Sequence, residues 1–119
     1  MKKRFLFIAL VMLVFSAVAY SQQQELLWNG TYRYTNSNGG QGVRSAEGKL
    51  LFSSTGGIEL LSNGAYWYSN SNGGQGIRSA EGKLLFSSTG RIELLPNGSY
   101  RVTDSGGRQT IRTADGRLL

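Results

Sequence analysis

The 119-residue chain contains no cysteine and no histidine, and it has a single proline. Without cysteine no disulfide can form, so an exported domain of this size must be stabilised by apolar burial, a partner or self-association. The lack of both residue types also removes nucleophile–base pairs built on thiol or imidazole, and zinc sites of the usual ligand types. The sequence therefore predicts a protein that is not an enzyme and that holds no metal and no cofactor.

Acidic residues are few, and they are spread along the chain. Two carboxylates facing each other in a cleft form the usual catalytic pair of glycosidases. Here the carboxylates recur two or three times in each of three repeated units, which is typical of a charged surface rather than of one asymmetric active site. The seven are Glu25, Glu47, Glu59, Glu81, Glu93, Asp104 and Asp115.

Residues 1–21 have the layout of a secretory signal peptide. Three basic residues precede an apolar run from Phe5 to Phe15, and small residues follow it, so that cleavage after Ala19 or after Ser21 fits. A transmembrane anchor would need about 20 apolar residues, and this stretch is shorter. We expect a protein, of bacterial origin, that is secreted or resides in the periplasm or outside the cell, and that meets the membrane only through its signal peptide before cleavage.

The net charge of the whole chain is higher than that expected for the chain without its signal peptide. The formal net charge is +6, with 13 basic and 7 acidic residues, and the signal peptide removes three basic residues, leaving ten against seven and a net charge of +3. Nucleic-acid-binding proteins gather basic residues on one element. Here Arg44 and Lys49 flank Glu47, and Arg78 and Lys83 flank an equivalent glutamate. We therefore expect no nucleic-acid partner.

The remainder, residues 22–119, consists of three copies of one 34-residue unit. Units 25–58 and 59–92 differ at six positions, and the twelve residues SAEGKLLFSSTG recur in them unchanged. Unit 93–119 has diverged and keeps mainly turn glycines and large apolar residues. This pattern predicts one tandem-repeat domain that arose by recent duplication.

Each unit is expected to contain four short strands separated by turns with glycine. In the second unit these are residues 57–61, 65–69, 76–80 and 83–88. Asn-Gly pairs favour tight hairpins, and the connections are too short for a parallel crossover. The sequence predicts an all-β fold, an antiparallel β-meander of three tandem 34-residue, four-stranded repeats, with residues 117–119 as a truncated twelfth strand.

The alternation of side chains gives each unit about six large apolar residues on one side. In a flat sheet most would stay hydrated, and each would forfeit about 1.5–3 kcal/mol of burial. Closure or stacking is therefore expected: the three units can close around a pseudo-threefold axis, as in a β-prism or β-trefoil, or stack as an open, curved sheet. The sequence leaves these two arrangements open.

Candidate ligand contacts come from polar and aromatic residues at equivalent positions of the units. Trp67 holds a position that is occupied by an arginine in the other two units. It is expected to face solvent, away from the neighbouring tyrosines, where it can stack on a sugar ring. The arginines of the third strands and a nearby glutamine form a second set: Arg44, Arg78, Arg112 and Gln75. The structural alternative is that these arginines pair with glutamates across the strands.

Together these features predict a secreted, non-enzymatic repeat module that acts as a cell-envelope or extracellular binding or structural protein. The alternative is a carbohydrate-binding, lectin-like module with weak, repeat-related sites. The expected partners are a glycan or a protein at the cell surface. Self-association is a further expectation, because near-identical strands rich in Gln, Asn and Ser can pair in register between chains.

Overall fold

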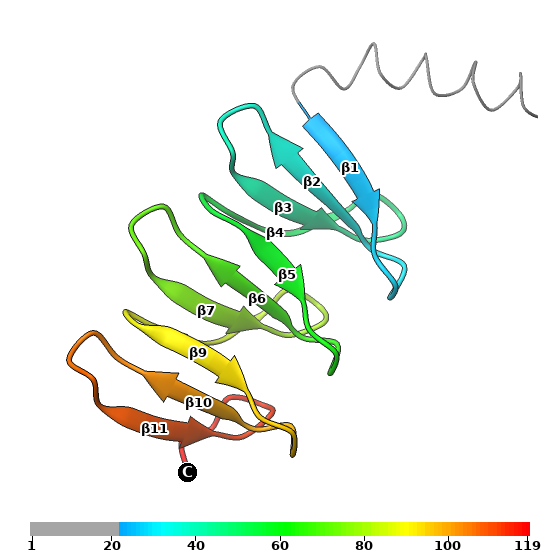
Figure 1. The fold of residues 1–119 in the computed structure, drawn as a ribbon. Coiled ribbons are helices and arrows are strands. Elements are labelled where there is room, and N and C mark those ends of the chain that lie inside the picture. The colour runs from blue at the N-terminus through cyan, green and yellow to red at the C-terminus, as the bar shows by residue number, and fades with distance from the viewer. Residues whose placement is uncertain (1–21) are drawn as a thin grey trace, which may run out of the picture.

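The computed structural model describes residues 22–119, which form eleven β-strands in three antiparallel sheets (Figure 1). The predicted signal peptide, residues 1–21, lies outside the described residues. No helix long and apolar enough to span a membrane is found in the described part of the chain. The predicted all-β class and antiparallel strand pairing are confirmed.

Consecutive strands are neighbours within every sheet. Sheet A contains β1 (Gln22–Leu26), β2 (Tyr32–Asn36), β3 (Gln41–Arg44) and β4 (Leu50–Ser54). Sheet B contains β5 (Ile58–Leu60), β6 (Tyr66–Ser69), β7 (Gln75–Arg78) and β8 (Leu84–Ser88). Sheet C contains β9 (Arg91–Leu94), β10 (Tyr100–Thr103) and β11 (Gln109–Arg112).

Two details of the predicted meander are wrong. Residues 117–119 form no twelfth strand, and only an isolated bridge joins Leu118 to Arg112. The strands also do not form one continuous sheet, because β4 and β5 lie in different sheets, as do β8 and β9. Residues 55–57 and 89–90 carry the chain from one sheet to the next instead of forming hairpin turns.

The hairpin turns within the sheets share one construction. After β5, Gly64 N donates to Leu61 O at 3.0 Å, and Leu61 N donates to Ala65 O at 2.8 Å. Gly64 has a φ of 89°, whereas Asn63 keeps a negative φ, and its Oδ1 accepts a hydrogen bond from Ala65 N at 3.1 Å. This is a type I turn followed by a bulge glycine. Asparagine therefore contributes through its side chain, and glycine alone supplies the left-handed backbone.

The three sheets lie face to face in an elongated row (Figure 1). The principal extents are 57 × 29 × 22 Å and the radius of gyration is 17.2 Å, whereas a compact domain of 100 residues has a radius of about 13 Å. The structure does not confirm the prism-like closure that the sequence left open.

Two apolar clusters fill the two junctions between the sheets. The cluster between sheets A and B contains Val43, Phe52, Ile58, Tyr66 and Tyr68. The cluster between sheets B and C contains Ala65, Ile77, Phe86, Ile92, Tyr100 and Val102. Sheet B is therefore buried on both faces. The row is stabilised junction by junction, as in a solenoid, and not by one central core.

Candidate functional site

The three predicted arginine contacts bind the turns of their own sheets, and two of them also contact the neighbouring sheet. Nη1 of Arg44, Arg78 and Arg112 donates to a glycine carbonyl in the following turn, at 3.2, 2.9 and 2.8 Å. Each guanidinium also lies over an aromatic ring; that of Arg78 is 5.1 Å from the centre of Phe52 and 5.5 Å from that of Tyr68. Arg78 and Arg112 thereby contact the preceding sheet, whereas Arg44 lies over Tyr34 of its own sheet, 5.2 Å from the ring centre. In each case the contacts give the arginine a structural task.

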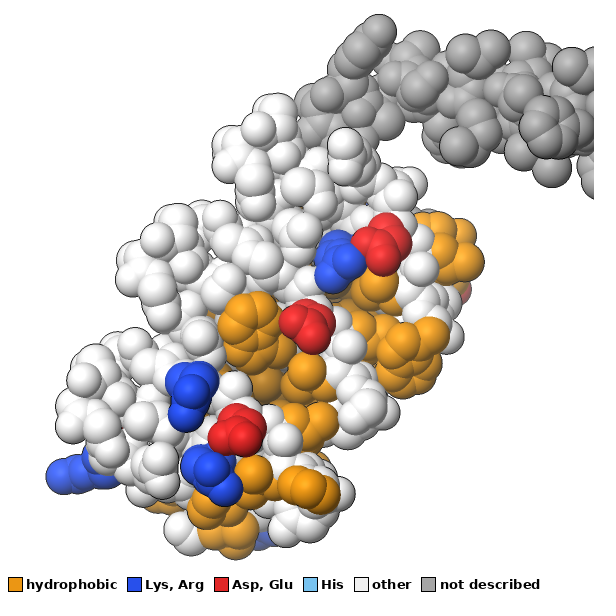
Figure 2. Space-filling model, viewed as in Figure 1, with side chains coloured by type: hydrophobic (Ala, Val, Ile, Leu, Met, Phe, Trp, Pro, Cys, Tyr) orange, Lys and Arg blue, Asp and Glu red, His pale blue; other side chains and the backbone are white. Residues whose placement is uncertain are grey.

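Other residues form the ion pairs of the described part of the chain. The expected pairing of Arg44 and Arg78 with the glutamates of the next turn is therefore not found among residues 22–119. On the face drawn in Figure 2, acidic and basic side chains lie beside one another, next to apolar side chains. The ion pairs are Arg33–Glu25, Arg101–Glu93 and Arg117–Asp115.

Trp67 and Gln75 also lie at a junction. Trp67 faces away from the tyrosines, as predicted, but it is half-buried against the cluster between sheets B and C and not open to solvent. Its Nε1 donates to Gln75 Oε1 at 3.1 Å, and Ile92 N donates to the same oxygen at 2.9 Å. Stacking of the sheets, which the sequence left open beside closure, places another sheet where solvent was expected.

A polar cleft of about 610 Å³ opens between sheets A and B, and a second of about 460 Å³ opens between sheets B and C. The residues of sheet A that line the first cleft have their 34-residue equivalents in the lining of the second. The first is lined by residues including Tyr34, Asn36, Asn38, Ser54, Asn70 and Ser71. The second is lined by residues including Tyr68, Asn70, Asn72, Ser88, Thr89 and Asp104.

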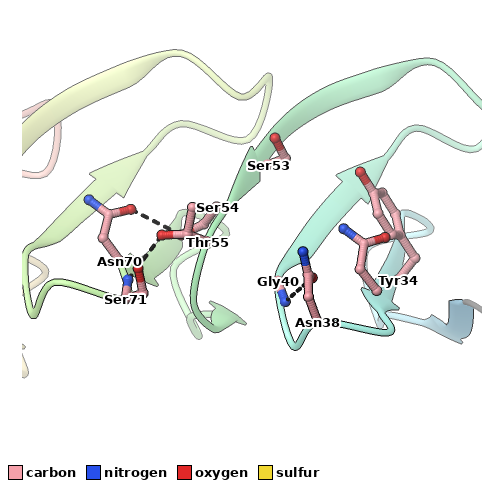
Figure 3. A pocket seen from close by; sticks show the side chains of 9 residues that line it. Tyr34, Asn38, Gly40, Ser53, Ser54, Thr55, Asn70 and Ser71 are labelled. Atoms are coloured by element: carbon pink, nitrogen blue, oxygen red, sulfur yellow. Dashed lines mark hydrogen bonds between the residues drawn. The ribbon is translucent and has the colours of Figure 1, made fainter.

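Hydrogen bonds between the sheets shape the first cleft (Figure 3). Ser54 Oγ donates to Asn70 Oδ1 at 3.2 Å, and Ser71 N donates to Thr55 Oγ1 at 2.9 Å. Side chains of both sheets therefore face one another across the opening. No residue lining the first cleft carries a charge, and the lining offers hydroxyl groups, side-chain amides and the ring of Tyr34. These groups suit an uncharged ligand with many hydroxyl groups.

Sequence reasoning missed these cleft residues. The runs Ser37–Gly42 and Ser69–Gly76 read as hairpin connections, and residues 37–40 and 70–74 of these runs do connect the strands of one sheet. Only the stacking of one sheet on the next brings these runs beside the Ser-Ser-Thr segments after Phe52 and Phe86. The recurrence of two hydroxyl- and amide-rich segments in the first two units was the available signal.

The carboxyl group of Asp115 has a pKa below its ordinary value, chiefly because the Thr113 hydroxyl donates a hydrogen bond to it, with Arg117 also contributing. A lowered pKa stabilises the fold above the ordinary aspartate pKa, and this contribution is lost as the pH falls through the lowered value. We expect Thr113→Ala to raise the pKa of Asp115 toward that of a free aspartate, measured by NMR titration of the carboxyl carbon. Thr103→Ala is the control, and an unchanged pKa in Thr113→Ala would contradict the assignment.

Comparison of the chain with protein-family models and with curated protein sequences finds no match.

Proposed function

We propose that the chain is an exported, non-enzymatic binding module built from three tandem 34-residue units, and that it acts in the cell envelope or outside the cell. One observation carries this proposal: the two junctions hold equivalent polar clefts. A catalytic site needs one asymmetric set of groups, whereas repeated clefts of similar lining suit multivalent binding of a repetitive partner. The leader-like N-terminus supports export.

The lining of the clefts favours a carbohydrate as the partner. In the first cleft, the hydroxyl and amide groups of Tyr34, Asn36 and Ser54 are hydrogen-bond donors and acceptors in the lining. Because the clefts are open rather than enclosed, each site is expected to bind weakly on its own. A glycan long enough to enter both clefts gains affinity by multivalency without new kinds of contact. A purely structural role in the envelope is the second candidate, since the elongated row also suits a spacer.

An array of neutral oligosaccharides, followed by calorimetry at millimolar sugar, tests the carbohydrate proposal. We expect the double variant Tyr34→Phe, Tyr68→Phe to bind about 2- to 10-fold more weakly, because one hydrogen bond is worth about 0.5–1.5 kcal/mol. Tyr32→Phe is the matched control, because Tyr32 lines neither cleft.

Each outcome discriminates between the candidates. Loss of affinity in the double variant alone supports the clefts as the glycan site. Equal affinity in all variants would place the glycan elsewhere on the molecule. Absence of binding to the whole array would leave the structural role.

A further inference from the structure

At the two ends of the row, the residues that are repeat-equivalent to buried junction residues lie on the outer faces. Sheet A has an outer face turned away from sheet B, and sheet C has an outer face turned away from sheet B on the other side (Figure 1). Within the row, each junction joins the downstream face of one sheet to the upstream face of the next. We call the face of a sheet that is turned toward the preceding sheet its upstream face, and the face turned toward the following sheet its downstream face. The outer face of sheet A is an upstream face, the outer face of sheet C is a downstream face, and neither is paired within the row.

The outer face of sheet A exposes positions that are covered in sheets B and C. Leu26 is 62% exposed, whereas its equivalents Leu60 and Leu94 are half-buried against the clusters. Tyr32 is half-buried, whereas the tyrosines at its position in sheets B and C expose nothing. A Cβ added at Gly48 would meet no atom within 4 Å. This face is thus an upstream face without a neighbour among the described residues.

The positions equivalent to Gly48 in the other units show what fits there. A Cβ at Gly82 would lie 3.0 Å from the Cβ of Leu51, and one at Gly116 would lie 3.0 Å from the Cβ of Leu85. In each case a leucine of the preceding sheet packs on the turn glycine. The equivalent leucine of sheet C is Leu119.

The outer face of sheet C exposes the complementary positions. Leu119 is 76% exposed, and Ile111 is half-exposed although its equivalents Val43 and Ile77 expose nothing. Gln109 is exposed, whereas the glutamines at its position in sheets A and B accept a backbone N–H from the next sheet at 2.7 and 2.9 Å. This face is a downstream face that retains most of the groups that contact the next sheet at the junctions.

We propose that a second copy of this chain stacks head to tail on the row, with the outer face of sheet A of one copy on the outer face of sheet C of the other. The inference is independent of the proposed glycan binding. In this contact Leu119 packs on Gly48 of the second copy, Asn97 Nδ2 donates to the hydroxyl of its Tyr32, and Gln109 Oε1 accepts from its Gln24 N. The junction pairs Leu85–Gly116, Asn63–Tyr100 and Gln75–Ile92 are the patterns for these three contacts.

The contact between copies is heterologous, so each dimer keeps one free face of each kind. Association therefore extends reversibly with concentration and does not stop at a dimer.

Sedimentation velocity of the processed chain, from micromolar to millimolar concentration, tests this proposal. We expect the average mass to rise with concentration, and Tyr32→Ala or Leu119→Asp to weaken association about tenfold or more. Leu84→Asp is the control for Leu119→Asp, because Leu84 is 45% exposed on the edge strand β8 of the middle sheet. Circular dichroism verifies that each variant keeps its β-structure.

Mixing the two variants distinguishes head-to-tail stacking from other modes. The Tyr32→Ala chain retains an intact sheet C face, and the Leu119→Asp chain retains an intact sheet A face. Their mixture should form dimers, whereas neither variant alone should associate appreciably. A constant monomer mass of the unmodified chain, undiminished association in the variants, or a mixture without dimers would overturn the proposal. Thioflavin-positive fibres that persist in both variants would indicate edge-to-edge strand pairing in its place.

Discussion

Replacing Tyr66 by alanine is expected to lower the free energy of unfolding by about 3–5 kcal/mol, the range for removing a buried aromatic side chain. Tyr66 exposes no surface, and its ring packs edge-on against Phe52 at 5.4 Å. Its hydroxyl accepts a hydrogen bond from Asn29 Nδ2 at 2.8 Å and bonds to Thr31 Oγ1 at 2.8 Å. The substitution therefore empties the centre of the junction between sheets A and B and leaves polar groups of sheet A without their partner.

Chemical or thermal unfolding measures this loss. Each kcal/mol corresponds to about 4–8 °C in the midpoint of a domain of this size. Tyr66→Phe separates the ring from the hydroxyl and should cost about 1–2 kcal/mol. Tyr32→Ala is the matched control, because Tyr32 holds the same repeat position at the half-exposed end of the row. Equal losses at Tyr32 and Tyr66 would contradict the junction as the source of stability.

The strands were predictable because their signals are local. Alternating apolar residues around Tyr66 and Tyr68, bounded by Asn63-Gly64 and by Gly73-Gly74, determine strand length and antiparallel pairing within one sheet. The predicted strands of the second unit agree with the structure within about two residues at each end. Period, class and pairing all follow from contacts between residues close in sequence.

The stacking was not predictable in the same way. The pattern of Trp67, Ile77 and Phe86 shows that apolar groups occur on the second face of sheet B, but it does not show what covers them. Closure and stacking bury comparable apolar area, so the hydrophobic term alone does not choose between them. The expectation that Trp67 meets solvent failed for this reason, since the next sheet, with Ile92, lies on that face.

The prediction of ligand contacts was limited for a related reason. Repeated polar residues indicate either a repeated ligand site or a repeated structural joint, and sequence does not separate the two. Gln75 and Arg78 have structural roles. Gln75 accepts a hydrogen bond from the backbone N–H of Ile92, and Arg78 donates one to the backbone carbonyl of Gly82. Asn36 and Asn38, which the sequence placed in a hairpin connection, line the cleft between sheets A and B.

The segments between the sheets carry glycine for a reason unlike that of the hairpins. Gly64 is needed for its φ of 89°. Gly56 has no positive φ, yet an added Cβ would lie against the carbonyl oxygen of Ser69 and 2.9 Å from its carbon. The backbone of the crossing segment therefore touches the backbone of β6 directly. The repeat itself contains a hint, because Gly56 recurs as Gly90, whereas its neighbour Gly57 is replaced by Arg91.

Gly56→Ala is accordingly expected to destabilise the chain by about 3 kcal/mol, near the upper end of the usual cost of overpacking. Neither partner of the clash is the far end of a flexible side chain, so the crossing segment must move away from β6. That movement also disturbs Ser54 Oγ, which donates to Ser69 O at 2.5 Å and accepts from Gly56 N at 3.2 Å. Urea unfolding of the variant measures the loss.

Gly57→Ala, one residue further along the chain, is the matched control. A Cβ at Gly57 would meet its nearest atom only at 3.8 Å, and φ there is not positive. We expect this change to be neutral or to stabilise by about 0.4–1 kcal/mol, because alanine reduces the conformational freedom of the unfolded chain. A large difference between neighbouring glycines would locate the constraint in the contact between sheets A and B. Equal effects would mean that the crossing segment tolerates side chains at both positions and that the close approach of Gly56 to Ser69 contributes little to the stack.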